Sequence, residues 1–139
     1  MIVLDTNVIS EMMKPRPNAV AIAWIDAQQE DFWTSAVTLQ EIVYGISRVK
    51  DAVYRDGLQR SFDKAFPRVI ADRILPLDDT AARSAGLIMA RRQLAGAQIS
   101  VPDAQIAAIV QANSATLATR DVSDFAGLGL SLVNPWEAA

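Results

Sequence analysis

Acidic residues follow four short apolar stretches of this chain, at the points where those stretches end. The acids are Asp5 after Met1–Leu4, Glu41 after Thr34–Gln40, Asp103 after Ile99–Pro102, and Asp121 after Ala115–Arg120, with Asp124 one turn further on. Carboxylates at strand ends and helix starts can meet at the carboxyl edge of an α/β sheet. Because converging carboxylates repel one another, they need a cation among them, and a hard divalent ion takes oxygen ligands. The pattern therefore predicts a site for a hard divalent cation.

The chain contains neither histidine nor cysteine. Their absence excludes Ser-His-Asp triads, imidazole acid–base catalysis and Cys-His nucleophile pairs, and it argues against a zinc site. Carboxylate, hydroxyl, lysine and metal chemistry remain. The net charge of −3 argues against strong nonspecific binding of nucleic acid. It does not exclude a nuclease, because bound cations offset the acids of a metal site.

Length and composition predict one globular domain spanning residues 1–139, since 51% of the residues are hydrophobic and 21% are charged. No apolar run approaches the length of a bilayer span, so we expect no membrane segment. The first residues lack the basic region of a signal peptide, and the lack of cysteine suits a cytoplasmic protein.

Alternating strands and helices are predicted to position the acids. The expected strands are Ile2–Leu4, Phe32–Ser35, Thr116–Thr119, Leu130–Val133 and, at a sheet edge because of its proline, Ile74–Leu77. The expected helices are a short one after Asp5, then 19–28, one opening at Thr38, 52–66, 79–94 and 102–112. This alternation indicates a parallel α/β sheet with helices on both faces.

Helical spacing also predicts which side chains face the core. In the helix 19–28 the expected apolar face consists of Val20, Ala23, Trp24 and Ala27. In the helix opening at Thr38 the residues expected to point inward are Leu39, Ile42, Val43 and Ile46.

Each acid also has an ordinary structural explanation. Asp5 could cap the following helix, and Thr38 with Glu41 matches a capping box. Asp103 suits the first turn of a helix, while Asp121 and Asp124 could cap a turn or face solvent. A ligand role is compatible with these explanations, because the first turn of a helix also points toward the sheet edge.

Polar neighbours strengthen the metal-site interpretation. Hydroxyls, an amide and a guanidinium lie beside the acids in the sequence, at Thr6, Asn7, Ser35, Thr38, Thr119 and Arg120. Such groups hold carboxylates in place or contact a phosphate. Serine, threonine and asparagine are also common turn residues, so no single one of them decides between the two explanations.

At these residues the chain resembles the PIN-domain family of metal-dependent ribonucleases, in particular the VapC-type toxins of bacterial toxin–antitoxin pairs and their FitB-like subgroup. The matching segments are Ile2–Ser10, Ser35–Ile46, Val101–Ala108, Leu117–Phe125 and Val133–Trp136. The resemblance covers nearly the whole chain and implies a three-layer α/β/α fold with a central, mostly parallel sheet of four to five strands. The stretch Arg48–Arg73 matches no family motif.

The resemblance implies roles for the acids and their neighbours. Asp5, Glu41, Asp103 and Asp121 match the acidic metal-site positions, and Asp124 matches a frequent additional acid. Thr6 and Asn7 match the turn after the first acid, and Thr119 the hydroxyl before the last. The implied activity is endoribonuclease cleavage, in which one or two Mg²⁺ or Mn²⁺ ions activate water and leave 5′-phosphate and 3′-hydroxyl ends.

The resemblance also implies partners. A cognate antitoxin protein would lay a helix or an extended tail into an apolar groove and place a basic side chain among the acids. A homodimer and an RNA substrate are expected, with operator DNA contacted only through the antitoxin. The candidate cations for RNA are Lys14, Arg16, Arg48, Lys50, Arg91, Arg92 and Arg120, of which Arg120 is best placed beside the acids.

Two other classes of function remain open on the sequence. One is a Mg²⁺-dependent phosphotransfer domain, but Asp5-Thr6-Asn7 lacks an Asp-x-Asp pattern and no lysine follows a later strand to meet a phosphate. The other is a non-catalytic module that binds RNA or a protein partner, which the intact set of acids disfavours.

Overall fold

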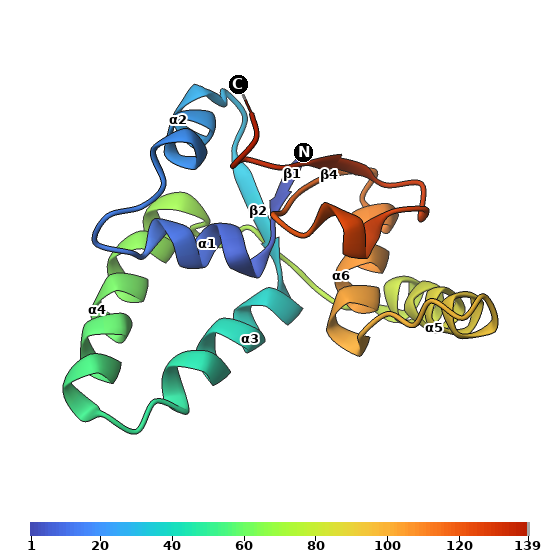
Figure 1. The fold of residues 1–139 in the computed structure, drawn as a ribbon, viewed down its shortest axis with the longest axis horizontal. Helices are drawn as coiled ribbons and strands as arrows, with labels where there is room; N and C mark the ends of the chain where they lie inside the picture. The colour runs from blue at the N-terminus through green and yellow to red at the C-terminus, as the bar shows by residue number, and fades with distance from the viewer. Residues whose placement is uncertain (139) are drawn as a thin grey trace.

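A parallel sheet of five strands forms the centre of the computed structural model, which describes residues 1–138 (Figure 1). The strands are β1 (Ile2–Leu4), β2 (Phe32–Ser35), β3 (Ile74–Leu75), β4 (Thr116–Ala118) and β5 (Ser131–Val133). They lie in the order β3-β2-β1-β4-β5, and every neighbouring pair is parallel. The predicted parallel sheet is confirmed, and all five strands end at the same edge.

Helices cover both faces of this sheet and make the expected α/β/α arrangement. They are α1 (Thr6–Met12), α2 (Ala19–Ala27), α3 (Ala36–Ser47), α4 (Ala52–Val69), α5 (Asp79–Leu94) and α6 (Val101–Ala112), with a 3₁₀ turn η1 (Val122–Phe125). Figure 1 shows α1, α2 and α4 on one side of the sheet and α5 and α6 on the other, with α3 below. No helix among residues 1–138 combines the length and apolarity needed to cross a membrane.

The central strand β1 divides the core into two clusters. Its three residues are all buried, and successive strand side chains point to opposite faces. Val3 packs with α5, α6 and Phe125, while Ile2 and Leu4 pack with residues of α1 to α4. Burial on both faces explains why β1 is continuously apolar and why its first polar residue, Asp5, marks the sheet edge.

Several predicted boundaries differ from the structure. Strand β3 does lie at an edge, as its proline indicated, but it ends at Leu75. Helix α4 continues through Pro67 to Val69, because Phe66 and Val69 pack into the core and hold the last turn. Helix α6 begins at Val101, one residue before Pro102, because Ser100 caps it.

Two predicted helix faces were wrong in part. In α2 Trp24 packs against the cluster containing Phe32, as predicted, but the buried residues are Ala21 and Ile25, and Val20 is 44% exposed. In α3 Ile42 and Ile46 are buried and Leu39 packs against the same cluster, as predicted, whereas Val43 is 48% exposed. Helix α3 starts at Ala36 rather than at Thr38, and it packs against α1, α4 and α6.

Candidate active site

Asp5 ends β1 and begins α1, and its carboxylate joins two neighbouring strands. Its Oδ1 accepts a hydrogen bond of 2.8 Å from the Thr6 backbone N–H, so the predicted helix cap is confirmed. Its Oδ2 accepts a bond of 2.7 Å from the Thr119 hydroxyl at the end of β4. Because β1 and β4 are paired, the two strand ends bring these side chains together. The Asp5 side chain is thus fixed at the carboxyl edge of the sheet.

Glu41 points toward α1 from the second turn of α3. The hydroxyl of Thr6 donates a hydrogen bond of 2.8 Å to Glu41 Oε1. The predicted capping box is wrong, because the cap is Ser35, whose Oγ accepts a bond of 3.0 Å from the Thr38 backbone N–H. Thr38 is therefore the third helical residue, and its buried hydroxyl lies 3.2 Å from Ser35 Oγ and 3.4 Å from Thr6 Oγ1.

Asn7 holds the loop after β4 against α1. Its side-chain amide donates to Asp121 Oδ2 at 3.1 Å and to Thr119 Oγ1 at 3.3 Å. Its side-chain oxygen accepts the Arg120 backbone N–H at 3.1 Å. The Asp121 backbone N–H in turn donates to Thr119 Oγ1 at 3.1 Å. Asn7 therefore holds Asp121 close to α1 and to Asp5, which precedes that helix.

Asp103 and Asp124 complete the acids on this side of the molecule. Asp103 lies in the first turn of α6, as predicted, and its backbone N–H donates to Ser100 Oγ at 3.2 Å. The sequence analysis missed Ser100, although a serine three residues before an acid is a recognisable capping pattern. Asp124 lies in η1, which Asp121 precedes without capping it through its side chain.

The acids act on one another electrostatically. Burial raises the pKa of Asp5 to about 6; bonds from Thr119 and Thr6 lower it, and the charges of Asp103 and Glu41 raise it further. Burial likewise raises the pKa of Asp103, against a hydrogen bond from Ser100, and the nearby acids add to the increase. Those acids are Asp124, Glu41 and Asp121. We call Asp5, Glu41, Asp103, Asp121 and Asp124 the acid cluster.

The chemistry of the acid cluster fits a divalent ion, although its side chains do not form a finished coordination sphere. In the part of the chain that the structure describes, no three acidic side chains lie close enough to hold one ion together. Asp5, Glu41 and Asp121 are engaged instead by hydroxyl and amide donors. The ligands on offer are oxygen atoms, and Asp5 is 5% exposed. Hard cations such as Mg²⁺ and Mn²⁺ select this type of donor, and a cation relieves the mutual repulsion.

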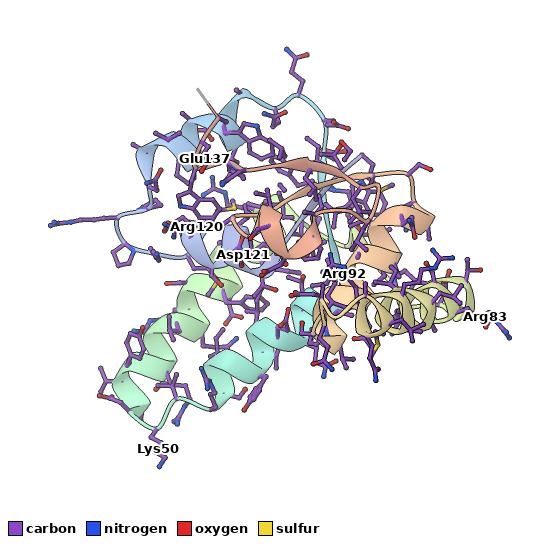
Figure 2. The ribbon with its side chains drawn as sticks, turned by 45° about the vertical axis from the view of Figure 1, so that its right-hand side comes forward. Lys50, Arg83, Arg92, Arg120, Asp121 and Glu137 are labelled. Atoms are coloured by element: carbon purple, nitrogen blue, oxygen red, sulfur yellow. The ribbon has the colours of Figure 1, made fainter. Side chains whose placement is uncertain are left out.

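Two of the predicted cations have partners near the acid cluster. The Arg120 guanidinium lies over the ring of Trp136, with its Cζ 5.2 Å from the ring centroid. The Arg92 guanidinium donates to the backbone carbonyls of Asp124 at 3.2 Å and Ala126 at 2.8 Å, so it braces the η1 segment. Figure 2 shows Arg120 beside Asp121, and Arg92 near the end of α5.

A cavity of about 730 Å³ opens next to the acid cluster, between α1, α3 and α4. We call it the apolar groove; its lining residues are Thr6, Ser10, Met13, Lys14, Pro15, Glu41, Ile42, Gly45, Ile46, Val53, Tyr54, Gly57, Leu58 and Ser61. Val53 and Tyr54 are 82% and 61% exposed on its wall. Since Thr6 and Glu41 line it too, the groove leads directly to the acids.

Comparison with known proteins gives consistent matches along the chain. The model of the PIN domain family matches residues 2–128. "VapC ribonuclease Y4jK" of Sinorhizobium fredii is 41% identical, with full coverage of both chains. "Toxin FitB" of Neisseria gonorrhoeae is 35% identical over 98% of this chain and 99% of its own. A crystal structure of FitAcB from Neisseria gonorrhoeae superposes with a TM-score of 0.87 at 35% identity, covering 99% of each chain.

Proposed function

The chain belongs to the PIN-domain family, and we propose on that premise that it is the toxin of a toxin–antitoxin pair and a Mg²⁺- or Mn²⁺-dependent endoribonuclease. The observation that carries this proposal is the position of the acid cluster. Five acids, spread from position 5 to position 124 of the sequence, lie at the carboxyl edge of a parallel sheet. They are close enough that the charges of the others raise the pKa of Asp5 and of Asp103. Open α/β sheets bind ligands at this edge.

We assign the ion to the oxygen atoms of Asp5, Glu41, Asp103 and Asp121, with Asp124 as a further acid. Thr119, Thr6 and Asn7 hold these carboxylates through hydrogen bonds, as outer groups do at metal sites. When bound, the ion supplies Lewis-acid activation of water and stabilises the charge on the scissile phosphodiester.

The chain's own residues then do three things. Thr119 and the Thr6 backbone keep the Asp5 carboxylate oriented toward the sheet edge. Asn7, two residues after Asp5, keeps Asp121 near it by donating hydrogen bonds to Thr119 and Asp121 in the segment after β4. The carboxylates next to the scissile phosphodiester accept the proton of the attacking water, since the chain has no histidine to do so. The ribose 2′-hydroxyl is not the nucleophile and needs no activation. The expected products carry 5′-phosphate and 3′-hydroxyl ends.

Cleavage of total RNA by antitoxin-free protein tests this proposal. We expect cleavage with Mg²⁺ or Mn²⁺, none with EDTA, and none with Asp103→Asn. The matched control is Asp26→Asn, which removes an exposed acid from α2 and should leave cleavage unchanged. Mapping of the cut ends distinguishes 5′-phosphates from other products. RNA that stays bound but uncut with either ion would contradict the enzyme and favour a non-catalytic binding module.

The apolar groove supports an antitoxin as the protein partner. One solved relative is the "Structure of FitAB bound to IR36 DNA fragment". The matching chain in it is 35% identical to this one and superposes with a TM-score of 0.87. We propose that a cognate antitoxin lays a helix or extended tail against Val53, Tyr54 and their neighbours and reaches Glu41 with a basic side chain. Operator DNA is then contacted through the antitoxin, which agrees with the net charge of −3 of this chain.

We also propose a homodimer. Three apolar side chains outside the groove support it, because Leu87, Leu94 and Val101 on α5 and α6 are 58%, 89% and 49% exposed. Apolar surface of this kind is typical of contact with another chain. Sedimentation analysis of the purified protein tests the dimer, and Leu94→Glu should shift it toward the monomer.

A further inference from the structure

The C-terminal segment Val133–Trp136 follows the residues that the PIN family model matches, and the proposed hydrolysis gives it no role. A short turn folds this segment back on the molecule, because the Trp136 backbone N–H donates to Asn134 Oδ1 at 3.0 Å. The Trp136 indole N–H donates to Glu11 Oε1 on α1 at 3.2 Å, and Pro135 is buried. The indole ring is thus held from its backbone and from its edge.

One face of this ring carries the side chain of Arg120. The Arg120 Cζ lies 5.2 Å from the ring centroid, in the range of a cation–π contact. Arg120 is exposed, and within residues 1–138 its guanidinium has no hydrogen-bond acceptor and no ion-pair partner. A cation–π contact holds a guanidinium over the ring and leaves its N–H donors available. Those donors are therefore held near one position but unused.

This oriented cation adjoins the acid cluster. The Arg120 backbone N–H is bonded to Asn7, and the residues on either side of it are Thr119 and Asp121, which belong to the acid network. Figure 2 shows Arg120 beside Asp121, on the side of the molecule that carries Glu137. A second cation is near, because Lys14 Nζ lies 3.0 Å from Glu11 Oε2. Glu11 thus pairs with Lys14 and also feels the charge of Arg120.

We propose that Arg120, held on the Trp136 ring, binds a phosphate of the RNA strand next to the one that is cut. This inference rests on the proposed ribonuclease function. A planar guanidinium binds a phosphate through two parallel hydrogen bonds, so prior orientation lowers the entropy lost on binding. The acid cluster repels the rest of the strand, and a fixed cation beside it offsets that repulsion. Trp136 and Glu11 are positioning residues, because they act through Arg120.

Binding of a short, fluorescently labelled, single-stranded RNA of mixed sequence tests the role of Arg120. The assay uses fluorescence anisotropy with Ca²⁺ in place of Mg²⁺, so that binding is followed while cleavage is slowed. Arg120→Ala should weaken binding about tenfold, as loss of a charged hydrogen-bonded pair does. It should also lower the slope of log Kd against log salt by about 0.7, the value for one phosphate contact on a single strand.

A matched control removes the same charge at the other edge of the sheet. Arg68 is an exposed arginine at the end of α4, which leads into the start of β3 and so lies opposite the acid cluster. Arg68→Ala should leave the affinity and the salt slope as in the wild type. If Arg120→Ala behaves like Arg68→Ala, the inference is overturned while RNA cleavage by the wild type stands. A wild-type protein that neither binds nor cleaves RNA contradicts the proposed function itself.

Substitutions of Trp136 separate positioning from direct contact. Trp136→Phe keeps a ring beneath Arg120 and should leave affinity within about twofold of the wild type, whereas Trp136→Leu should weaken it about threefold with the salt slope unchanged. In an Arg120→Ala background, Trp136→Leu should have no further effect. Further weakening in that background would show that the ring itself stacks on RNA, which contradicts a positioning role. Circular dichroism spectra matching that of the wild type control for folding, since both variants lose the hydrogen bond to Glu11 and should melt at a lower temperature.

Discussion

The side-chain amide of Asn7 and the carboxylate of Asp121 are joined by a hydrogen bond of 3.1 Å, although 114 positions separate them in the sequence. The same amide group accepts the backbone N–H of Arg120, so one residue of α1 holds three consecutive positions after β4. Asp121 therefore keeps its place near Asp5 through a neutral side chain rather than through a counter-charge.

Replacement of this side chain tests its role. We expect Asn7→Ala to reduce Mg²⁺-dependent RNA cleavage by about 10- to 100-fold, as loss of a group that orients a metal ligand does. The free energy of unfolding should fall by about 1 kcal/mol, because the Arg120 backbone N–H loses its acceptor. Cleavage rates and chemical denaturation measure the two effects. A variant with the wild-type rate would show that Asp121 needs no support from Asn7.

The buried charge of Asp5 predicts opposite effects on stability and on metal binding. Because burial and neighbouring acids raise its pKa to about 6, the ionised form costs folding free energy at neutral pH. Asp5→Asn should therefore raise the free energy of unfolding in EDTA by about 1–2 kcal/mol. Weakening of the hydrogen bond from Thr119 would reduce this gain.

Metal titration provides the other half of that experiment. Mn²⁺ should raise the melting temperature of the wild type, since an ion that binds only the folded state stabilises it. The Asp5→Asn protein should show little of this increase, while Asp26→Asn should show all of it. Equal increases in the Asp5→Asn protein and the wild type would contradict the assignment of Asp5 as a ligand.

Glu11 predicts a dependence of stability on pH. Hydrogen bonds from Lys14 and then Trp136, with the charges of Lys14 and Arg120, lower the pKa of Glu11 against the effect of burial. An acid whose pKa is lower in the folded state than in the unfolded state stabilises the fold. For Glu11 this contribution is complete above the unfolded pKa of 4.5, and it disappears as the pH falls through the lower pKa of the folded state. Wild type should exceed Glu11→Gln in unfolding free energy by about 1 kcal/mol at pH 7.

The pH series is the decisive part of the Glu11 measurement. Urea denaturation of both proteins from neutral to strongly acidic pH should show the difference shrinking below about pH 4.5, where Glu11 becomes protonated in the unfolded chain, and vanishing below the lower pKa of the folded state. A difference that stays constant over the whole series would mean that the carboxylate charge contributes nothing.

The apolar groove predicts a variant that loses its protein partner and keeps its enzyme activity. Val53 is 82% exposed, so Val53→Glu leaves the core intact but places a charge where an antitoxin segment would be buried. We expect antitoxin affinity to fall at least about tenfold, as measured by calorimetry, with unchanged RNA cleavage. Val20→Glu on α2, 44% exposed and outside the groove, is the control. Equal affinities of the two variants would place the antitoxin elsewhere.

Replacement of two glycines by alanine should have opposite effects on the stability of the protein. Gly86 lies inside α5 with no atom within 4 Å of an added Cβ, so Gly86→Ala should stabilise the protein by about 0.5–1 kcal/mol. Gly127 has equal space but a φ of +79°, so Gly127→Ala should destabilise it by about 1 kcal/mol or more. Thermal melting of both variants measures the difference; stabilisation by Gly127→Ala would mean that this loop is not held at positive φ.

The local pattern of the chain was sufficient to predict much of the fold. Short apolar runs bounded by turn residues gave β1, β2 and β4, and the proline after β3 correctly placed that strand at an edge. Such patterns reflect period and burial, which each segment carries in its own residues. The face of α2 and the start of α3 were wrong, because they depend on which neighbour packs against the helix and on the cap at Asn18 or Ser35.

The sequence by itself determined which groups are available: carboxylates after apolar stretches, and no histidine or cysteine. Only the tertiary structure decided their partners. Glu41 receives the Thr6 hydroxyl from 35 positions away, and Glu11 receives the Trp136 indole N–H from 125 positions away. These hydrogen bonds depend on distances of about 3 Å, which follow from the rotation of each helix on the sheet and from the order of the strands. Neither quantity is present in the spacing of residues along the chain.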